Sequence, residues 1–224
     1  MGRPRQHDER TGVTLLDAAE QMVERDGVEA LSVRRLADEA GTSTRAVYSL
    51  FGSKAGLVDA LGSRAFDWLA DELVAVEPSD DPRSDLVDAG ARTFRRLVTE
   101  HPALFRVGFG RPKADAAAGT RDAADRAMDA LQARLVRLER AGLLPRRTVA
   151  EAAREFHALC LGLADLELRD PLSPARSRRM WRDALTTLVD GLTAPAPDAA
   201  TTRRARPARR CASAGSPGGA GRPA

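Results

Sequence analysis

Residues 31–57 read LSVRRLADEAGTSTRAVYSLFGSKAGL, and this stretch predicts two short helices joined by a tight turn, with a third helix directly after them. Ser32 and Ser43 are suitable N-caps, because a serine hydroxyl accepts a hydrogen bond from a free N–H of the first helical turn. Gly41 can turn the chain at positive φ, and Gly52 ends the second helix before Ser53 caps the third. Two short helices across a glycine-containing turn are typical of the helix-turn-helix.

The apolar residues of this stretch recur with helical spacing. In the first helix they share one face, which comprises Val33, Leu36, Ala37 and Ala40. In the second helix the inward residues are Ala46, Val47 and either Leu50 or Phe51. Other faces of the second helix carry Thr44, Arg45, Tyr48 and Ser49. We therefore expect the second helix to present a polar face to its surroundings.

The string Tyr48-x-x-Phe51-x-Ser53-Lys54-x-x-Leu57, preceded by Leu36-Ala37-x-x-Ala40-Gly41, resembles the DNA-binding domain of the TetR family of bacterial transcriptional regulators. A bare helix-turn-helix pattern is weak evidence, since any small helical hairpin imitates it, but the full string near the start of a chain of 224 residues is specific. The resemblance covers residues 10–60. It implies a three-helix DNA-binding unit followed by a helical domain that holds an effector and pairs two subunits.

The resemblance also implies which residues contact DNA. Residues early in the second helix, Thr44, Arg45 and Ala46, would face base edges in the major groove. A guanidinium can donate twice to guanine, so Arg45 is the main candidate for base recognition. Further contacts, to bases or phosphates, are implied for Arg34, Ser43, Tyr48 and Lys54. Leu50 departs from the family, which often has an aromatic residue or histidine there, and a solvated surface arginine is the alternative for Arg45.

The rest of the chain shows no strand pattern, so the predicted fold class is all-α, with an N-terminal helix-turn-helix domain and a C-terminal helical bundle for ligand binding and dimerisation. We expect a flexible arm over residues 1–9, a DNA-binding domain over 10–57, a regulatory and dimerisation domain over 58–193 and a disordered tail over 194–224. In the arm, Arg3 and Arg5 either reach DNA or are simply solvated.

A long helix is expected from Ser53 to about Val76, too long for the small N-terminal unit, so it should bridge into the second domain. Ser84 is expected to cap a helix that ends at His101, and Thr148-x-x-Glu151 is a capping box that opens a later helix. Helices are also expected over residues 11–25, 103–109, 122–141 and 173–192. The resemblance implies that the last two long helices pair with a second subunit, although by pattern alone they could be buried within one chain.

The charge of the chain is unevenly distributed. The tail from Pro195 carries six arginines and one acid, while the whole chain is +3, so residues 1–194 sum to −2. The first 60 residues hold eight basic and ten acidic residues, also −2. Net charge therefore does not by itself indicate nucleic-acid binding. The tail either attracts phosphates without sequence preference or is an inert solubilising segment.

Catalytic and metal-binding constellations are not recognisable in the sequence. The two cysteines suggest neither a disulfide framework nor a zinc site, and Cys160 fits a helical apolar stripe as a small core residue. His157 lies three residues before Cys160, but no further ligand set or orienting group accompanies the pair. Glycine-rich phosphate loops, GxSxG and HExxH are absent from the sequence. We expect neither an enzyme nor a bound cofactor or metal.

The C-terminal half has a second, less specific resemblance. The strings His101–Arg106 (HPALFR) and Gly162–Glu167 (GLADLE) resemble a TetR subgroup named for Trp, His and Gly residues, although His157 and Leu161 stand at the Trp and His positions and only Gly162 matches. The family implies a pocket for a small hydrophobic effector. Its candidate lining residues, for each of which core packing is the alternative, are Phe94, Leu97, Phe105, Phe109, Met128, Phe156, His157, Cys160 and Trp181.

Together these patterns favour a ligand-responsive repressor that binds a palindromic double-stranded DNA operator as a homodimer. The alternative is an all-α interaction protein that has lost specific DNA binding, and the acidic balance of the first 60 residues is its support. No apolar run approaches the ~20 residues needed to span a bilayer, and no signal peptide is visible. We therefore expect a cytoplasmic protein without a membrane partner.

Overall fold

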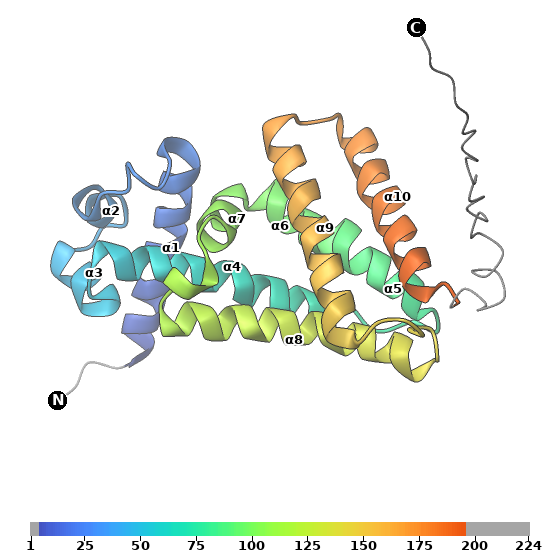
Figure 1. Cartoon of the computed structure of the whole chain (residues 1–224). Helices are drawn as coiled ribbons and strands as arrows, with labels where there is room; N and C mark the ends of the chain where they lie inside the picture. The colour runs from blue at the N-terminus through green and yellow to red at the C-terminus, as the bar shows by residue number, and fades with distance from the viewer. Residues whose placement is uncertain (1–4, 196–224) are drawn as a thin grey trace, which may run out of the picture. The chain divides into compact units, whose positions relative to one another are not determined.

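The computed structural model describes residues 5–195, apart from the side chains of residues 5–8 and 113, and contains only helices and connections over that range (Figure 1). The all-α prediction is confirmed. Residues 5–194 belong to one compact unit. Arg3 and most of the arginine-rich tail lie outside the described residues. None of the described helices is both long and apolar enough to cross a bilayer.

The first three helices pack around a small core. They are α1 (Arg5–Asp26), α2 (Val33–Glu39) and α3 (Thr44–Phe51). The fully buried side chains include Leu15, Met22, Leu36 and Val47, which come from all three helices. Burial of each of these side chains contributes roughly 1.5–3 kcal/mol and holds the three helices together. α1 begins at Arg5, so residues 5–9 are helical rather than part of a flexible arm; arginine, glutamine and glutamate are good helix formers there.

Helix α4 (Lys54–Ala75) runs from this unit into the second part of the molecule, as expected. It lies alongside α8 (Ala118–Arg140) for most of its length (Figure 1). Its inward face is buried and includes Leu57, Leu61, Ala65, Leu69 and Leu73. At the far end, the buried Arg134 of α8 donates to the carbonyl oxygens of Leu73 and Val76, which have no partner within the helix.

The helix expected over residues 84–101 is more irregular than its pattern predicts. Asp81, not Ser84, is the N-cap of α5 (Pro82–Asp88), because its carboxylate accepts from the first free N–H groups while Pro82 needs no acceptor. A π-helical segment (Ala89–Phe94) follows and leads into α6 (Arg95–Glu100). Gly90 lies in that segment against Leu185 and Phe156, where a Cβ atom would meet the Leu185 side chain at 2.6 Å.

The remaining helices enclose the second core. They are α7 (Pro102–Phe109), α9 (Val149–Arg169) and α10 (Pro174–Thr193), with a short 3-10 turn (Lys113–Asp115) before α8. The capping box of Thr148 and Glu151 is present at the start of α9. Glu167 joins α9 to both neighbours: its carboxylate accepts from Trp181 Nε1 at 2.8 Å and pairs with Arg95 at 3.2 Å.

Candidate nucleic-acid interface and internal cavity

The turn between α2 and α3 holds the two helices in a fixed relation. Gly41 has φ of 63°, and its N–H donates to Asp38 while the N–H of Thr42 donates to Ala37, which closes α2 with a Schellman motif. Ser43 Oγ then accepts from the N–H of Ala46 at 3.2 Å and caps α3. The C-terminal end of α2 and the N-terminal end of α3 are therefore both satisfied by hydrogen bonds within the turn.

The outer face of α3 presents polar side chains around one buried anchor. Val47 is buried against α1 and α2, whereas Thr44, Arg45 and Tyr48 are exposed, Tyr48 to 53%. Ala46 is half-buried at the edge of this face. Phe51 rather than Leu50 packs inward, which resolves the alternative left by the sequence. Such a face can enter a major groove, where Arg45 would reach base edges and Tyr48 a phosphate.

Neighbouring arginines of this unit differ in whether they are paired. Arg35 lies 2.8 Å from Asp26 and also near Glu39, so its charge is locally balanced. Among the described residues, no carboxylate lies within ion-pair distance of Arg34 or Arg45, and both are exposed. The net charge of −2 over the first 60 residues therefore conceals two unneutralised guanidinium groups on the α2–α3 surface.

Lys54 has a structural partner that the sequence did not suggest. Its Nζ donates to the backbone oxygen of Glu29 at 3.1 Å, so the first residue of α4 fastens the connection between α1 and α2. Ser53 caps α4 by accepting from the N–H of Gly56 at 3.0 Å. An ammonium group has three donors, so this bond leaves Lys54 able to contact a phosphate as well.

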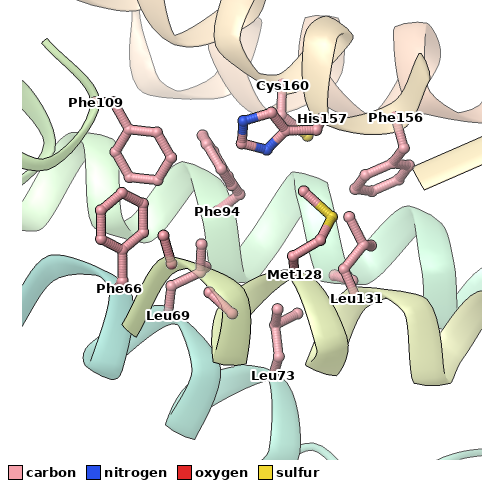
Figure 2. A pocket seen from close by; sticks show the side chains of 13 residues that line it. Phe66, Leu69, Leu73, Phe94, Phe109, Met128, Leu131, Phe156, His157 and Cys160 are labelled. Carbon is pink, nitrogen blue, oxygen red and sulfur yellow. The ribbon is translucent and has the colours of Figure 1, made fainter. Parts of the chain in front are cut away.

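An apolar cavity of about 40 Å³ lies between α4, α8, α9 and the π-helical segment (Figure 2). Six of the nine predicted lining residues surround it, namely Phe94, Phe109, Met128, Phe156, His157 and Cys160. The other three, Leu97, Phe105 and Trp181, do not line this cavity; they are buried in the packed core, and Trp181 is held there by its bond to Glu167. A position on an apolar stripe predicts burial but does not distinguish core from cavity wall.

The residues of α4 that line the cavity were not predicted from the sequence. Phe66, Leu69 and Leu73 face the cavity from this helix, and Leu131 faces it from α8 (Figure 2). Ala124 of α8 also lines the cavity. The helical spacing of these residues was visible, but it did not reveal that α4 borders the cavity as well as connecting the two parts of the molecule. The same helix therefore contacts α3 at its start and the cavity at its middle.

A larger outer chamber of about 260 Å³ adjoins the apolar one. The two share five lining residues: Phe66, Phe109, Ala124, Met128 and His157. The outer chamber also has a polar side, to which Arg111, Thr120 and Asp125 contribute. We therefore treat the two as one site, with an apolar inner chamber and a more polar outer chamber.

The polar side of the outer chamber is joined directly to α4. Arg111 lies 2.8 Å from Asp59 Oδ1, and Thr120 Oγ1 donates to the backbone oxygen of Asp59 at 2.9 Å. Thr120 also lies 3.0 Å from Ser63 Oγ. A displacement of either chamber residue would thus act on the second and third turns of α4, in the half of that helix that begins at the helix-turn-helix.

Both titratable groups of the inner chamber are uncharged near neutral pH. Burial lowers the pKa of His157, so its imidazole is neutral at pH 7. Burial raises the pKa of the Cys160 thiol, so this side chain stays protonated at neutral pH. A protonated thiol does not act as a nucleophile. Among the described residues, no three or more His, Cys, Asp or Glu side chains converge as a metal site.

Known families match both parts of the chain. Residues 15–61 match the family described as bacterial regulatory proteins of the tetR family, and residues 87–192 match the tetracyclin repressor-like C-terminal domain. Together the two matches span more than half of the 224 residues. The protein belongs to the TetR family. The N-terminal unit is accordingly a helix-turn-helix DNA-binding unit of that family, as predicted.

A named repressor and two solved structures are similar to this chain and agree with its membership of the family. The HTH-type transcriptional repressor DrrR1 of Streptomyces coeruleorubidus is 33% identical over an alignment of 106 residues, and the match covers 44% of this chain and only 35% of that relative. A protein of unknown function from Rhodococcus sp. RHA1 is 26% identical, with a TM-score of 0.72 over 82% of this chain and 96% of that one. NalD from Pseudomonas aeruginosa, the secondary repressor of the MexAB-OprM multidrug efflux pump, is 26% identical, with a TM-score of 0.59 over 84% and 98%.

Proposed function

We propose that this TetR-family protein is a sequence-specific transcriptional repressor whose α3 helix reads an operator. The observation that carries the proposal is the exposed Arg45, which has no carboxylate partner within residues 5–195, on a helix that is capped by Ser43 and ended by Gly52. Arg45 would donate twice to a guanine, with Thr44 and Ala46 beside it, while Arg34, Ser43, Tyr48 and Lys54 would hold phosphates or flanking bases. Family membership and the resemblance to DrrR1 support this function.

The proposed active form is a homodimer on a palindromic operator. Helices α9 and α10 carry apolar side chains that are not covered within the chain: Leu166 is 54% exposed, and Leu159, Met180 and Leu188 are only partly buried. A second copy would cover them in a self-complementary interface. Two α3 helices would then enter successive major grooves, about 34–36 Å apart.

The proposed regulator is a small hydrophobic effector in the two-chamber site. The inner chamber is small, so a ligand would have to displace its walls, and Phe66, Leu69 and Leu73 on one of those walls belong to α4. Movement of α4 would carry α3 with it and change the separation of the two reading helices. The effector would thus favour the DNA-free state of a two-state equilibrium, because it binds that state more tightly.

Several finer assignments belong to this proposal. Its domains are residues 10–57 for DNA binding and 58–193 for regulation and dimerisation, with the tail over 194–224 outside both. We place the protein in the cytoplasm, without catalytic activity, cofactor or membrane partner. The subgroup named for Trp, His and Gly is supported by the strings His101–Arg106, at the N-cap and start of α7, and Gly162–Glu167, on α9.

The salt dependence of DNA binding tests the proposal against its alternative. A phosphate-contacting repressor loses affinity steeply as salt rises, whereas an interaction module without DNA function shows no specific complex. The acidic balance of residues 1–60 favours that alternative. Arg45→Ala should weaken specific binding by ~1–3 kcal/mol, while Arg140→Ala, at the opposite end of α8 from the helix-turn-helix (Figure 1), is the matched control. Equal affinity of both variants and the wild type would exclude Arg45 as the reading residue.

A further inference from the structure

The inner chamber contains one side chain with strong hydrogen-bonding capacity. All its other lining residues are alanine, leucine, phenylalanine or methionine, apart from the weakly polar thiol of Cys160. That side chain is His157 of α9, which also lines the outer chamber. In Figure 2 its imidazole lies over the cavity, beside Phe94 and Phe109. His157 is therefore placed where any occupant of either chamber would meet it.

The ring nitrogens of His157 have no partner in the part of the chain that the structure describes. The contacts of the imidazole there are with rings: Phe94 meets it edge-on at 6.1 Å, and Phe109 lies tilted at 6.0 Å. These nitrogens are not among the fully buried polar atoms that lack a partner, so they are accessible to an occupant of the chamber, and a hydrogen bond to a ligand would replace one to water. Because the imidazole is neutral, it offers one donor and one acceptor and has no charge to attract an anion.

The surrounding wall is aromatic. Phe109 contacts Phe66 at 4.7 Å and Phe105 at 5.0 Å between ring centroids, and Phe94 at 5.5 Å. Planar rings pack favourably against such a cluster in offset or edge-on arrangements. A flat aromatic ligand can use these contacts, whereas a branched or globular one would have to separate the rings.

The sizes and charges of the chambers restrict the ligand further. About 40 Å³ in the inner chamber is too little for a fused ring system, whereas the outer chamber has about 260 Å³. The outer chamber is lined by both Arg111 and Asp125, which have opposite charges and favour neither sign of ligand. An ionised ligand would also pay heavily to leave water for the apolar wall.

We propose that His157 determines the specificity of this site, and that its effector is a neutral, planar aromatic molecule with a hydroxyl group that hydrogen-bonds the imidazole. The ring system occupies the outer chamber against Phe66 and Phe109, and the hydroxyl points toward His157 at the junction of the chambers. This assignment deepens the proposed function, because it names the class of effector. Ligand binding itself can be measured without DNA.

Calorimetric titration of the purified full chain at pH 7.5 with three matched probes tests the assignment. The probes are 2-naphthol, its isostere 2-methylnaphthalene, which cannot hydrogen-bond, and the anionic 2-naphthoate. We expect the wild type to bind 2-naphthol about tenfold more tightly than 2-methylnaphthalene, the effect of one good hydrogen bond, and 2-naphthoate more weakly than 2-naphthol. His157→Phe should bind 2-methylnaphthalene at least as tightly as 2-naphthol, and His157→Gln, which keeps a donor and an acceptor, should retain part of the preference.

Three results would overturn the assignment. They are equal binding of 2-naphthol and 2-methylnaphthalene by the wild type, the same preference in both His157 variants, and absence of binding by all three probes to a folded wild-type chain. The titration of His157→Gln keeps the test decisive if His157→Phe does not fold. If the wild type does not bind DNA, the proposed function is contradicted, but its affinities for the three probes are unaffected. Failure of the proposed function and failure of the ligand assignment are therefore distinguishable.

Discussion

Asp59 of α4 is tied twice to the wall of the outer chamber: its carboxylate lies 2.8 Å from the guanidinium of Arg111, and its backbone oxygen accepts from Thr120 at 2.9 Å. Asp59 lies in the second turn of the helix that begins at Lys54, directly after α3. These two contacts therefore join the outer chamber to the part of α4 that lies next to the helix-turn-helix. A ligand that displaces Arg111 would break its ion pair with Asp59 and leave only the hydrogen bond from Thr120.

Asp59→Asn should weaken the coupling between effector and DNA. The substitution keeps the backbone bond to Thr120 but removes the charge that holds Arg111. Since the pair is partly exposed, the free energy of unfolding should change by less than ~1 kcal/mol. The ratio of DNA affinities without and with 2-naphthol, measured by fluorescence anisotropy, should be smaller in the variant. An unchanged ratio would show that the signal does not pass through this ion pair.

Gly90→Ala should destabilise the second core. The new Cβ atom would meet side-chain atoms of Leu185 at 2.6 Å and Phe156 at 2.9 Å, which forces both side chains to move. Overpacking of this kind costs about 1–3 kcal/mol. Gly12→Ala in α1 is the control, because nothing lies within 4 Å of its Cβ position, and it should be neutral or stabilising by up to ~1 kcal/mol. Urea denaturation of both variants checks this contrast, and a Gly90→Ala variant as stable as wild type would contradict the packing.

Leu166→Lys should separate the proposed dimer. Leu166 is 54% exposed on α9, and a lysine there would place a charge in an interface that is apolar in the proposed assembly. The control is Val74→Lys on α4, where an apolar residue is 75% exposed but lies outside α9 and α10. Analytical ultracentrifugation at micromolar concentration should give a monomer for the first variant and a dimer for the second. A dimer in both would place the interface elsewhere.

The stability of the protein should depend on His157 at mildly acidic pH. Burial lowers the pKa of this residue in the folded state, while an unfolded chain protonates it near its ordinary value of about 6.5. The unfolded state therefore binds more protons below that pH, and the free energy of unfolding falls as pH decreases. Between pH 7 and pH 5 the free energy of unfolding of the wild type should fall more than that of His157→Gln. Parallel pH profiles of the two proteins would show that His157 is not the group responsible.

Much of the helix-turn-helix could be predicted because its determinants are local. Ser32, Ser43 and Ser53 each accept a bond from the first turn of the following helix, and Gly41 and Gly52 have positive φ. Side-chain caps and glycine turns are properties of a few neighbouring residues, so the sequence displays them directly. For the same reason, the capping box of α9 was predicted correctly.

Features that depend on distant residues could not be predicted. The π-helical segment at Ala89–Phe94 places Gly90 against Leu185 and Phe156, which are remote in sequence. Likewise, the apolar stripes did not show that Trp181 would be fully buried with its indole on Glu167, while Phe66 would border a cavity. The partner of Lys54, a backbone oxygen in the preceding connection, also has no sequence signal.

Selection of bound sequences from a random pool of double-stranded DNA, with the purified protein at moderate salt, tests the proposed reading of an operator most directly. We expect enrichment of a palindrome whose half-sites lie about one helical turn of DNA apart. Each half-site should contain a guanine whose preference disappears in Arg45→Ala but persists in Arg140→Ala. Failure of a folded, dimeric and ligand-free protein to enrich any sequence would contradict specific DNA recognition by α3.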